Sequence, residues 1–201
     1  SDGTAFDEAV KLAGQENADL VLATDPDGDR IGVAAKNKDG GYEVLGGSEV
    51  GALLTHYILS SKKGVTSRDA VVKTIVTSEL GAAVAEDFGA TVFNTLTGFK
   101  YIGAMIGEFE KGGIHDFAFG YEESCGYLAG TFVRDKDAVI AAALICDMTS
   151  FYLEKGMTLL DALEALGCKY GYYSDELLSY ACGDEAGSEA FKRLVGPLKD
   201  A

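Results

Sequence analysis

The sequence has little of what marks exported, membrane-spanning or zinc-binding proteins. Its 201 residues include no tryptophan, two prolines and four cysteines. The cysteines form no CxxC pair and no histidine stands at zinc-finger spacing, which argues against a zinc site. No apolar run reaches the roughly 18 residues that a membrane-spanning helix needs, and the acidic start lacks the basic region of a signal peptide. We therefore expect a cytoplasmic protein with reduced thiols and no membrane partner.

Basic charge is scarce as well. The chain has 17 Lys and Arg residues against 32 Asp and Glu residues, a formal net charge of −15. Such a chain repels the phosphates of nucleic acids and anionic lipid surfaces, so neither is an expected partner. Hydrophobic residues make up 47% of the chain and charged residues 24%, the balance of a globular protein, and the 26 glycines indicate many tight turns or close backbone contacts.

Patterns typical of helices and strands alternate along the chain. Residues 19–24 are a short apolar run that stops at an Asp-Pro dipeptide, which predicts a buried strand followed by a loop. Residues 31–35 and 42–45 predict a hairpin. The further strands are predicted at 69–76, 90–94 and 116–119, and the helices at 5–15, 48–60, 79–88 after a Ser78 cap, 99–110, 138–153, 158–166 and 185–195. This alternation predicts an α/β domain with a largely parallel sheet.

The loop after the first predicted strand carries three carboxylates at alternating positions, Asp25, Asp27 and Asp29, followed by Arg30. In open α/β sheets, ligands bind outside the carboxyl ends of the strands. Three converging anions are unfavourable unless a cation lies among them, and oxygen ligands of this kind select Mg²⁺, Ca²⁺ or Mn²⁺. Arg30 adds a planar guanidinium that suits a phosphate oxygen beside the metal.

Other interpretations of this loop stay open. An EF-hand beginning at Asp25 is excluded, because its sixth and twelfth positions are Arg30 and Lys36 rather than Gly and Glu. The loop alone is also compatible with an acidic turn in solvent, with a non-catalytic divalent-metal-binding module, and with a phosphatase in which Asp25 is the nucleophile. The phosphatase would form an aspartyl phosphate and hydrolyse it unaided.

Three later loops carry residues suited to binding a sugar or an anion. Glu122 and Ser124 lie two residues apart between glycines, a spacing that can hold two neighbouring sugar hydroxyls. Gly98 and Lys100 open a predicted helix, where backbone N–H groups and a cation can meet an anion. Residues 134–137 place two cations and two anions before the long helix. The alternatives are a plain polar turn for the first loop, and for the last a surface charge cluster whose final residue caps the helix.

Four segments, DPDGDR, TLTGFK, GYEESCGYL and RDKDAV, occur in this order between residues 24 and 139. Together they resemble the α-D-phosphohexomutase superfamily of phosphoglucomutases and phosphomannomutases. The resemblance implies Mg²⁺-dependent interconversion of glucose or mannose 1-phosphate and 6-phosphate through a phosphoserine and a bisphosphate intermediate, or, as the alternative, a phosphopentomutase acting on ribose phosphate. By position it implies that Asp25, Asp27 and Asp29 bind Mg²⁺, that Arg30 and Lys136 are catalytic at the phosphate and at the reacting hydroxyl, and that Thr97, Gly98, Lys100, Glu122, Ser124 and Arg134 bind the phosphosugar.

The resemblance also implies the fold and the domain organisation. Residues 46–165 are expected to form a three-layer α/β/α domain with a mixed, mostly parallel four-stranded sheet. Residues 1–45 would be the C-terminal part of a preceding similar domain, carrying the metal loop, and residues 166–201 a linker toward a further domain. The strand at 19–24 would then be an exposed sheet edge.

The sequence departs from the family in two loops. It has no Thr-Ala-Ser-His-Asn-Pro loop with the nucleophilic serine, and no Arg-x-Ser-Gly-Thr-Glu phosphate loop. We therefore expect a fragment that is inactive by itself and works together with the remaining domains of a parent chain.

Overall fold

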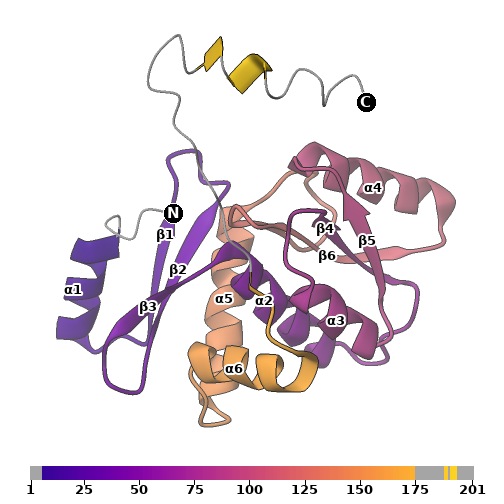
Figure 1. Ribbon diagram of the computed structural model, residues 1–201. Helices are drawn as coiled ribbons and strands as arrows, with labels where there is room; N and C mark the ends of the chain where they lie inside the picture. Colours follow the sequence, from indigo (N-terminus) through magenta and orange to yellow (C-terminus); the bar gives the residue numbers. More distant parts are fainter. Residues whose placement is uncertain (1–5, 175–187, 190, 194–201) are drawn as a thin grey trace.

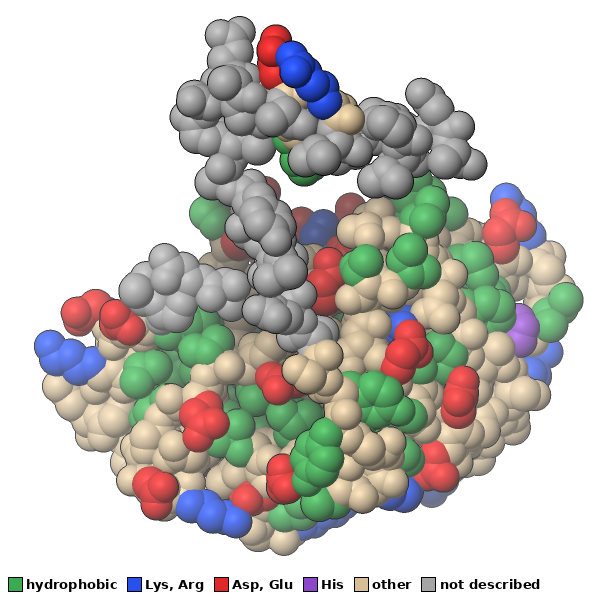
Figure 2. Space-filling model, viewed as in Figure 1, with side chains coloured by type: hydrophobic (Ala, Val, Ile, Leu, Met, Phe, Trp, Pro, Cys, Tyr) green, Lys and Arg blue, Asp and Glu red, His purple; other side chains and the backbone are tan. Residues whose placement is uncertain are grey.

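The computed structural model describes residues 6–174, 188–189 and 191–193. The helix predicted at 185–195 lies largely outside these residues. Among the residues described, no helix is long and apolar enough to cross a membrane. On the face shown in Figure 2, Asp and Glu side chains are scattered among polar and hydrophobic ones, and Lys and Arg lie mainly toward the rim.

The N-terminal part is an antiparallel three-stranded sheet with a helix on one face. Its strands β1 (Leu20–Thr24), β2 (Ile31–Lys36) and β3 (Tyr42–Leu45) follow one another in space as they do in sequence. Side chains alternate across β2, as they must in a strand. Ala34 packs with Phe6 and Ala13 beneath α1 (Asp7–Glu16), while Ile31 and Val33 face the main core. The predicted hairpin is confirmed, and β1 lies at an edge of the described sheet.

The second sheet has four strands in the order β5-β4-β6-β7. The central strand β4 (Asp69–Thr74) is buried along its whole length and pairs in parallel with β5 (Thr91–Thr95) and β6 (Asp116–Glu122). The short β7 (Gly126–Leu128) returns antiparallel to β6. The predicted mixed, mostly parallel sheet is confirmed.

Helices cover both faces of this sheet, which gives three layers (Figure 1). On one face, Ala70 and Val72 of β4 pack against the apolar face of α4 (Phe99–Gly112). On the other, Val71 and Tyr121 share a core with the remaining helices. These helices are α2 (Gly47–Ser61), α3 (Leu80–Asp87), α5 (Ala138–Leu153) and α6 (Leu159–Tyr170). The same core takes in Ile31, Val33 and Leu45, so the two sheets are packed through α5 and α6.

Some local predictions need correction. Ser78 is not the N-cap of α3: that position is Glu79, and Ser78 Oγ accepts the Leu80 N–H at 3.3 Å. Strand β7 was not predicted, because three residues are too few to show alternation. Helix α6 begins at a capping box formed by Thr158 and Asp161 and extends to Tyr170, past the predicted end at residue 166, because no glycine with a positive φ or proline ends it before Gly171, whose φ is 101°.

Candidate functional site

The acidic loop after β1 folds back on itself around Asp25. Asp25 Oδ1 accepts the N–H groups of Asp29 and Arg30, at 3.3 and 3.2 Å, and Oδ2 accepts Arg30 Nε at 2.8 Å. Gly28 makes the turn with a φ of 67°, in the left-handed region. Loss of solvent alone would raise the pKa of Asp25, but the hydrogen bonds from Arg30 and Asp29 outweigh it and hold that pKa below its usual value. Asp25 is therefore an ionised carboxylate that already orients Arg30.

Asp29 meets Lys136, which comes from the loop before α5. Lys136 Nζ lies 2.8 Å from Asp29 Oδ2 and 3.3 Å from Asp135 Oδ1. The other oxygen, Asp29 Oδ1, is buried without a hydrogen bond and lies 3.8 Å from Arg30 Nε. Burial alone would lower the pKa of Lys136, but its bonds to the two carboxylates raise it. The lysine thus lies against the acidic loop as a cation.

Glu122, at the end of β6, is buried and is held by the N-cap residue of α4. Its Oε1 accepts the Gly98 N–H at 2.9 Å, where Gly98 has a φ of 117° at the N-cap of α4. Burial raises the pKa of Glu122, the Gly98 bond opposes that rise and the neighbouring Glu123 charge adds to it. In this structure the Gly98 N–H at the start of α4 is engaged by the carboxyl group of Glu122.

The acidic loop and the Glu122 turn are joined directly. Ile31 N–H donates to Cys125 O at 3.1 Å, and Arg30 pairs with Gly126 as an antiparallel bridge. Lys136 reaches the same junction from the loop before α5, and its side chain packs so closely over Gly126 that a Cβ there would lie 2.7 Å from Lys136 Cδ. A shallow pocket of about 280 Å³ opens at this junction, with Asp25, Arg30 and Ser124 in its wall.

The other predicted residues make no direct bond to the acidic loop among the described contacts. Ser124 and Thr97 are exposed on their loops, and the Lys100 ammonium lies over the Tyr101 ring, 4.9 Å from its centre. Arg134 is turned toward α4, where its guanidinium makes bonds of 2.7 and 2.6 Å to both carboxylate oxygens of Glu110. The structure thus brings together the acidic loop, Glu122, Gly98 and Lys136, and holds Arg134 against a helix.

The carboxylate oxygens of the acidic loop fit a hard divalent cation by chemistry, and the buried Asp29 Oδ1, which accepts no hydrogen bond, is an oxygen available for one. However, among the described residues no three His, Cys, Asp or Glu side chains are gathered closely enough to hold a metal ion. Asp27 is exposed, and Asp25 is engaged by Arg30. The three aspartates would have to turn toward one another to bind a metal.

A polar cluster at the end of β4 was missed by the sequence analysis. It consists of Lys73, Thr74, Thr77, Glu79 and Glu123, joined by side-chain hydrogen bonds. The signal was present, since a buried strand that ends in Lys-Thr is unusual in placing a charge at a core position. The apolar composition of residues 69–76 concealed it.

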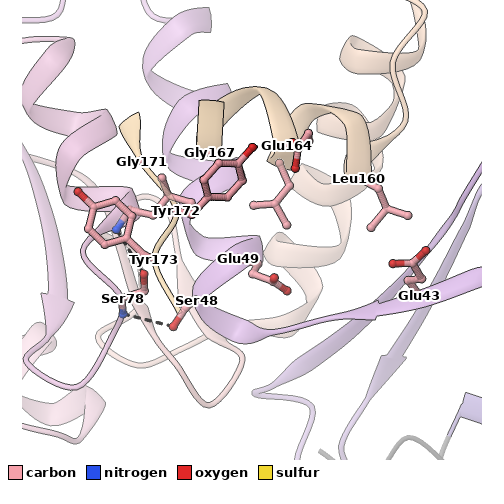
Figure 3. A pocket seen from close by; sticks show the side chains of 12 residues that line it. Glu43, Ser48, Glu49, Ser78, Leu160, Glu164, Gly167, Gly171, Tyr172 and Tyr173 are labelled. Atoms are coloured by element: carbon pink, nitrogen blue, oxygen red, sulfur yellow. Dashed lines mark hydrogen bonds between the residues drawn. The ribbon is translucent and has the colours of Figure 1, made fainter. Parts of the chain in front are cut away.

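A separate pocket of about 370 Å³ lies between α2, α3 and α6 (Figure 3). Glu43, Glu49 and Glu164 stand around it together with Tyr172 and Tyr173. None of the residues predicted for the site lines this pocket, so the predicted site residues and this cavity lie in different parts of the structure.

Comparison with known families decides the identity of the fold. The family model described as phosphoglucomutase/phosphomannomutase, alpha/beta/alpha domain III, matches residues 46–170. The chain belongs to this family. The resemblance inferred from the four segments is confirmed.

Curated relatives match nearly the whole chain. A phosphoglucomutase of Staphylococcus haemolyticus (strain JCSC1435) is 40% identical over 195 residues, which is 97% of this chain and 35% of that protein. A phosphoglucomutase of Staphylococcus aureus (strain MSSA476) is 35% identical over 194 residues, 96% of this chain and 35% of that protein. The chain therefore spans only about a third of the length of the curated relatives it matches.

Solved structures share the fold. A phosphomannomutase-like protein from Thermus thermophilus superimposes with a TM-score of 0.66 at 24% identity, over 84% of this chain and 35% of that one. An N-acetylglucosamine-phosphate mutase of the alpha-D-phosphohexomutase superfamily gives a TM-score of 0.54 at 14% identity, over 89% of this chain and 40% of that one. At these identities the likeness concerns the fold alone.

Proposed function

We propose that the chain is part of a Mg²⁺-dependent phosphohexomutase that interconverts the 1-phosphate and 6-phosphate of glucose, mannose or both. The reaction would pass through a phosphoserine and a sugar bisphosphate. The observation that carries the proposal is the Ile31 to Cys125 hydrogen bond, because it joins the acidic loop to the Glu122 turn in a member of the mutase family.

The acidic loop would serve the phosphate. Asp25, Asp27 and Asp29 would hold Mg²⁺, which when bound neutralises charge on the phosphate oxygens. Arg30, already oriented by Asp25, would bind a phosphate oxygen beside the metal through its planar guanidinium.

The second half of the junction would serve the sugar. Glu122, fixed on the Gly98 N–H, and Ser124 would bind neighbouring hydroxyls. Lys136, which touches Asp29 and packs over Gly126, would exchange a proton with the reacting hydroxyl. We assign Thr97 and Lys100 to contacts with the phosphosugar at the start of α4, and Arg134 to a supporting contact beside them.

A chimera tests the proposal. The 195-residue matching stretch of the S. haemolyticus phosphoglucomutase is replaced by the corresponding part of this chain, and conversion of glucose 1-phosphate to glucose 6-phosphate is measured with and without MgCl₂. We expect Mg²⁺-dependent turnover, and we expect Asp27→Asn to abolish it. Wild-type turnover in Asp27→Asn would refute the metal assignment.

Assays on the same protein preparations distinguish the possible substrates and the competing functions. Mannose 1-phosphate and ribose 1-phosphate, assayed beside glucose 1-phosphate, distinguish a phosphohexomutase from a phosphopentomutase. The 201-residue chain alone is expected to show no turnover, because it lacks the serine loop. Hydrolysis of a sugar phosphate by this chain would favour the phosphatase, and metal binding without turnover in the chimera would favour a non-catalytic metal-binding module. The cytoplasmic location stays a prediction.

A further inference from the structure

The polar cluster at the end of β4 is hydrogen-bonded to the turn that follows Glu122. Thr74 Oγ1 donates to Glu123 Oε2 at 2.9 Å, and Thr77 Oγ1 lies 2.6 Å from Thr74 Oγ1. Thr77 Oγ1 is also 3.4 Å from Glu123 Oε2, so each threonine hydroxyl is within hydrogen-bond distance of that carboxylate oxygen and of the other hydroxyl. Both threonines are buried, so losing these bonds would leave polar atoms unpaired away from water.

Lys73 fixes the far end of this cluster. Its side chain is fully buried, and its Nζ donates to Thr77 O at 3.1 Å and to Glu79 Oε1 at 2.8 Å. A buried ammonium is unfavourable unless it is paired, so both contacts are needed. They hold the backbone of the turn after β4 and thereby the position of Thr77.

The turn from Glu123 to Cys125 is confined from other sides too. A Cβ at Gly47 would lie 2.1 Å from Glu123 O, which shows that the start of α2 touches the turn backbone. Cys125 has a φ of 65°, a left-handed conformation that is rare for a residue other than glycine and needs support from its surroundings. The Ile31 N–H supplies one such support at Cys125 O.

We propose that Glu123 is a positioning residue: anchored by Thr74 and Thr77, it fixes the turn so that the Glu122 carboxylate stays on the Gly98 N–H and turns its second oxygen to a sugar hydroxyl. The sugar contact rests on the proposed function. The placement of Glu122 on Gly98 does not, and it can be measured without any ligand.

Hydrogen exchange in the 201-residue chain tests the placement. The Gly98 amide is followed by NMR, and the Ala90 amide, which donates to Ala85 O at 3.0 Å, is the reference for general loosening of the domain. We expect Glu123→Ala to speed exchange at Gly98 about tenfold relative to Ala90, since one hydrogen-bonded anchor is lost. Glu108→Gln, which removes a carboxylate from an exposed pair on α4, is the control and should leave the ratio unchanged.

Threonine variants distinguish a loss of positioning from misfolding of the Glu123→Ala protein. Thr77→Val removes the hydroxyl at nearly constant size and should raise the same ratio, while Thr77→Ser should restore it. If Glu123 and Thr77 only stabilised the domain as a whole, their variants would speed exchange of the Gly98 and Ala90 amides alike. The ratio of the two exchange rates would then keep its wild-type value. A ratio within about twofold of wild type in both Glu123→Ala and Thr77→Val overturns the proposal, since the loss of a buried hydrogen bond should exceed that.

The proposed sugar binding is tested separately on the same protein samples. Glucose 1-phosphate and MgCl₂ are added to the wild-type chain, and shifts of the Gly98 and Ser124 amides are recorded. Their absence counts against sugar binding, while the exchange ratio still decides whether Glu123 places Glu122.

Discussion

Gly126 stands where three parts of the candidate site meet. A Cβ at this position would lie 2.7 Å from Lys136 Cδ and 3.3 Å from Glu122 Oε2. Its φ is not in the left-handed region, so an alanine would be opposed by lack of space rather than by backbone strain. Because the flexible Lys136 side chain gives way more easily than the strand, we expect Gly126→Ala to displace Lys136 from Asp29.

The expected result is a loss of at least about tenfold in turnover of the chimera, with a decrease of about 1–3 kcal/mol in the free energy of unfolding from overpacking. Gly107→Ala on α4 is the matched control, since no atom lies within 4 Å of its Cβ position and alanine favours a helix. Full turnover in Gly126→Ala would show that Lys136 does not act from this position.

At the scale of elements, the segment RDKD combines a helix cap with a site residue. Asp137 is the N-cap of α5 and its Oδ1 accepts the N–H groups of Val139 and Ile140, at 2.8 and 3.1 Å. We expect Asp137→Ala to lower the free energy of unfolding by about 1 kcal/mol, and Asp137→Asn to retain most of it, because asparagine caps equally well. Chemical denaturation of the 201-residue chain measures both.

Lys136→Met distinguishes the contribution of Lys136 to turnover from the contribution of the Asp137 cap to stability. We expect this change to reduce turnover of the chimera strongly, while the helix cap keeps its stabilising effect. If Asp137→Ala were to leave stability unchanged, the Asp137 side chain would not be the cap that the structure shows.

The elements that could be predicted are those whose signal is local. The apolar run at β4 and the Asp-Pro stop after β1 were sufficient to place two strands, and motif order was sufficient to place the acidic loop. The Gly98 to Glu122 bond could not be predicted, because it joins residues 24 positions apart and depends on how β6 ends beside α4. Lys73 is a different case, because its partners Thr77 and Glu79 are only four and six residues away, but the strand pattern does not show that the turn after β4 brings them to its ammonium group.

At the scale of the whole molecule, the two sheets share one apolar core. Residues 1–45 were expected to belong to a preceding similar domain, and in the structure Ile31, Val33 and Leu45 are buried together with residues of α5 and α6. The two parts should therefore unfold together. This also explains how the acidic loop, which belongs to the first sheet, is held beside the Glu122 turn of the second.

Ile31→Ala tests this coupling. Ile31 is 1% exposed, and removing its side chain from the core should lower the free energy of unfolding by about 2–5 kcal/mol. Because the core is common, hydrogen exchange should accelerate in β2 and in β4 alike, and thermal unfolding should stay a single transition at a lower midpoint. Leu12→Ala on α1, where the side chain is 58% exposed, is the control and should change the midpoint little. Acceleration confined to β2 would mean that the first sheet opens on its own, and the acidic loop would then lose its fixed place beside Glu122 whenever it did so.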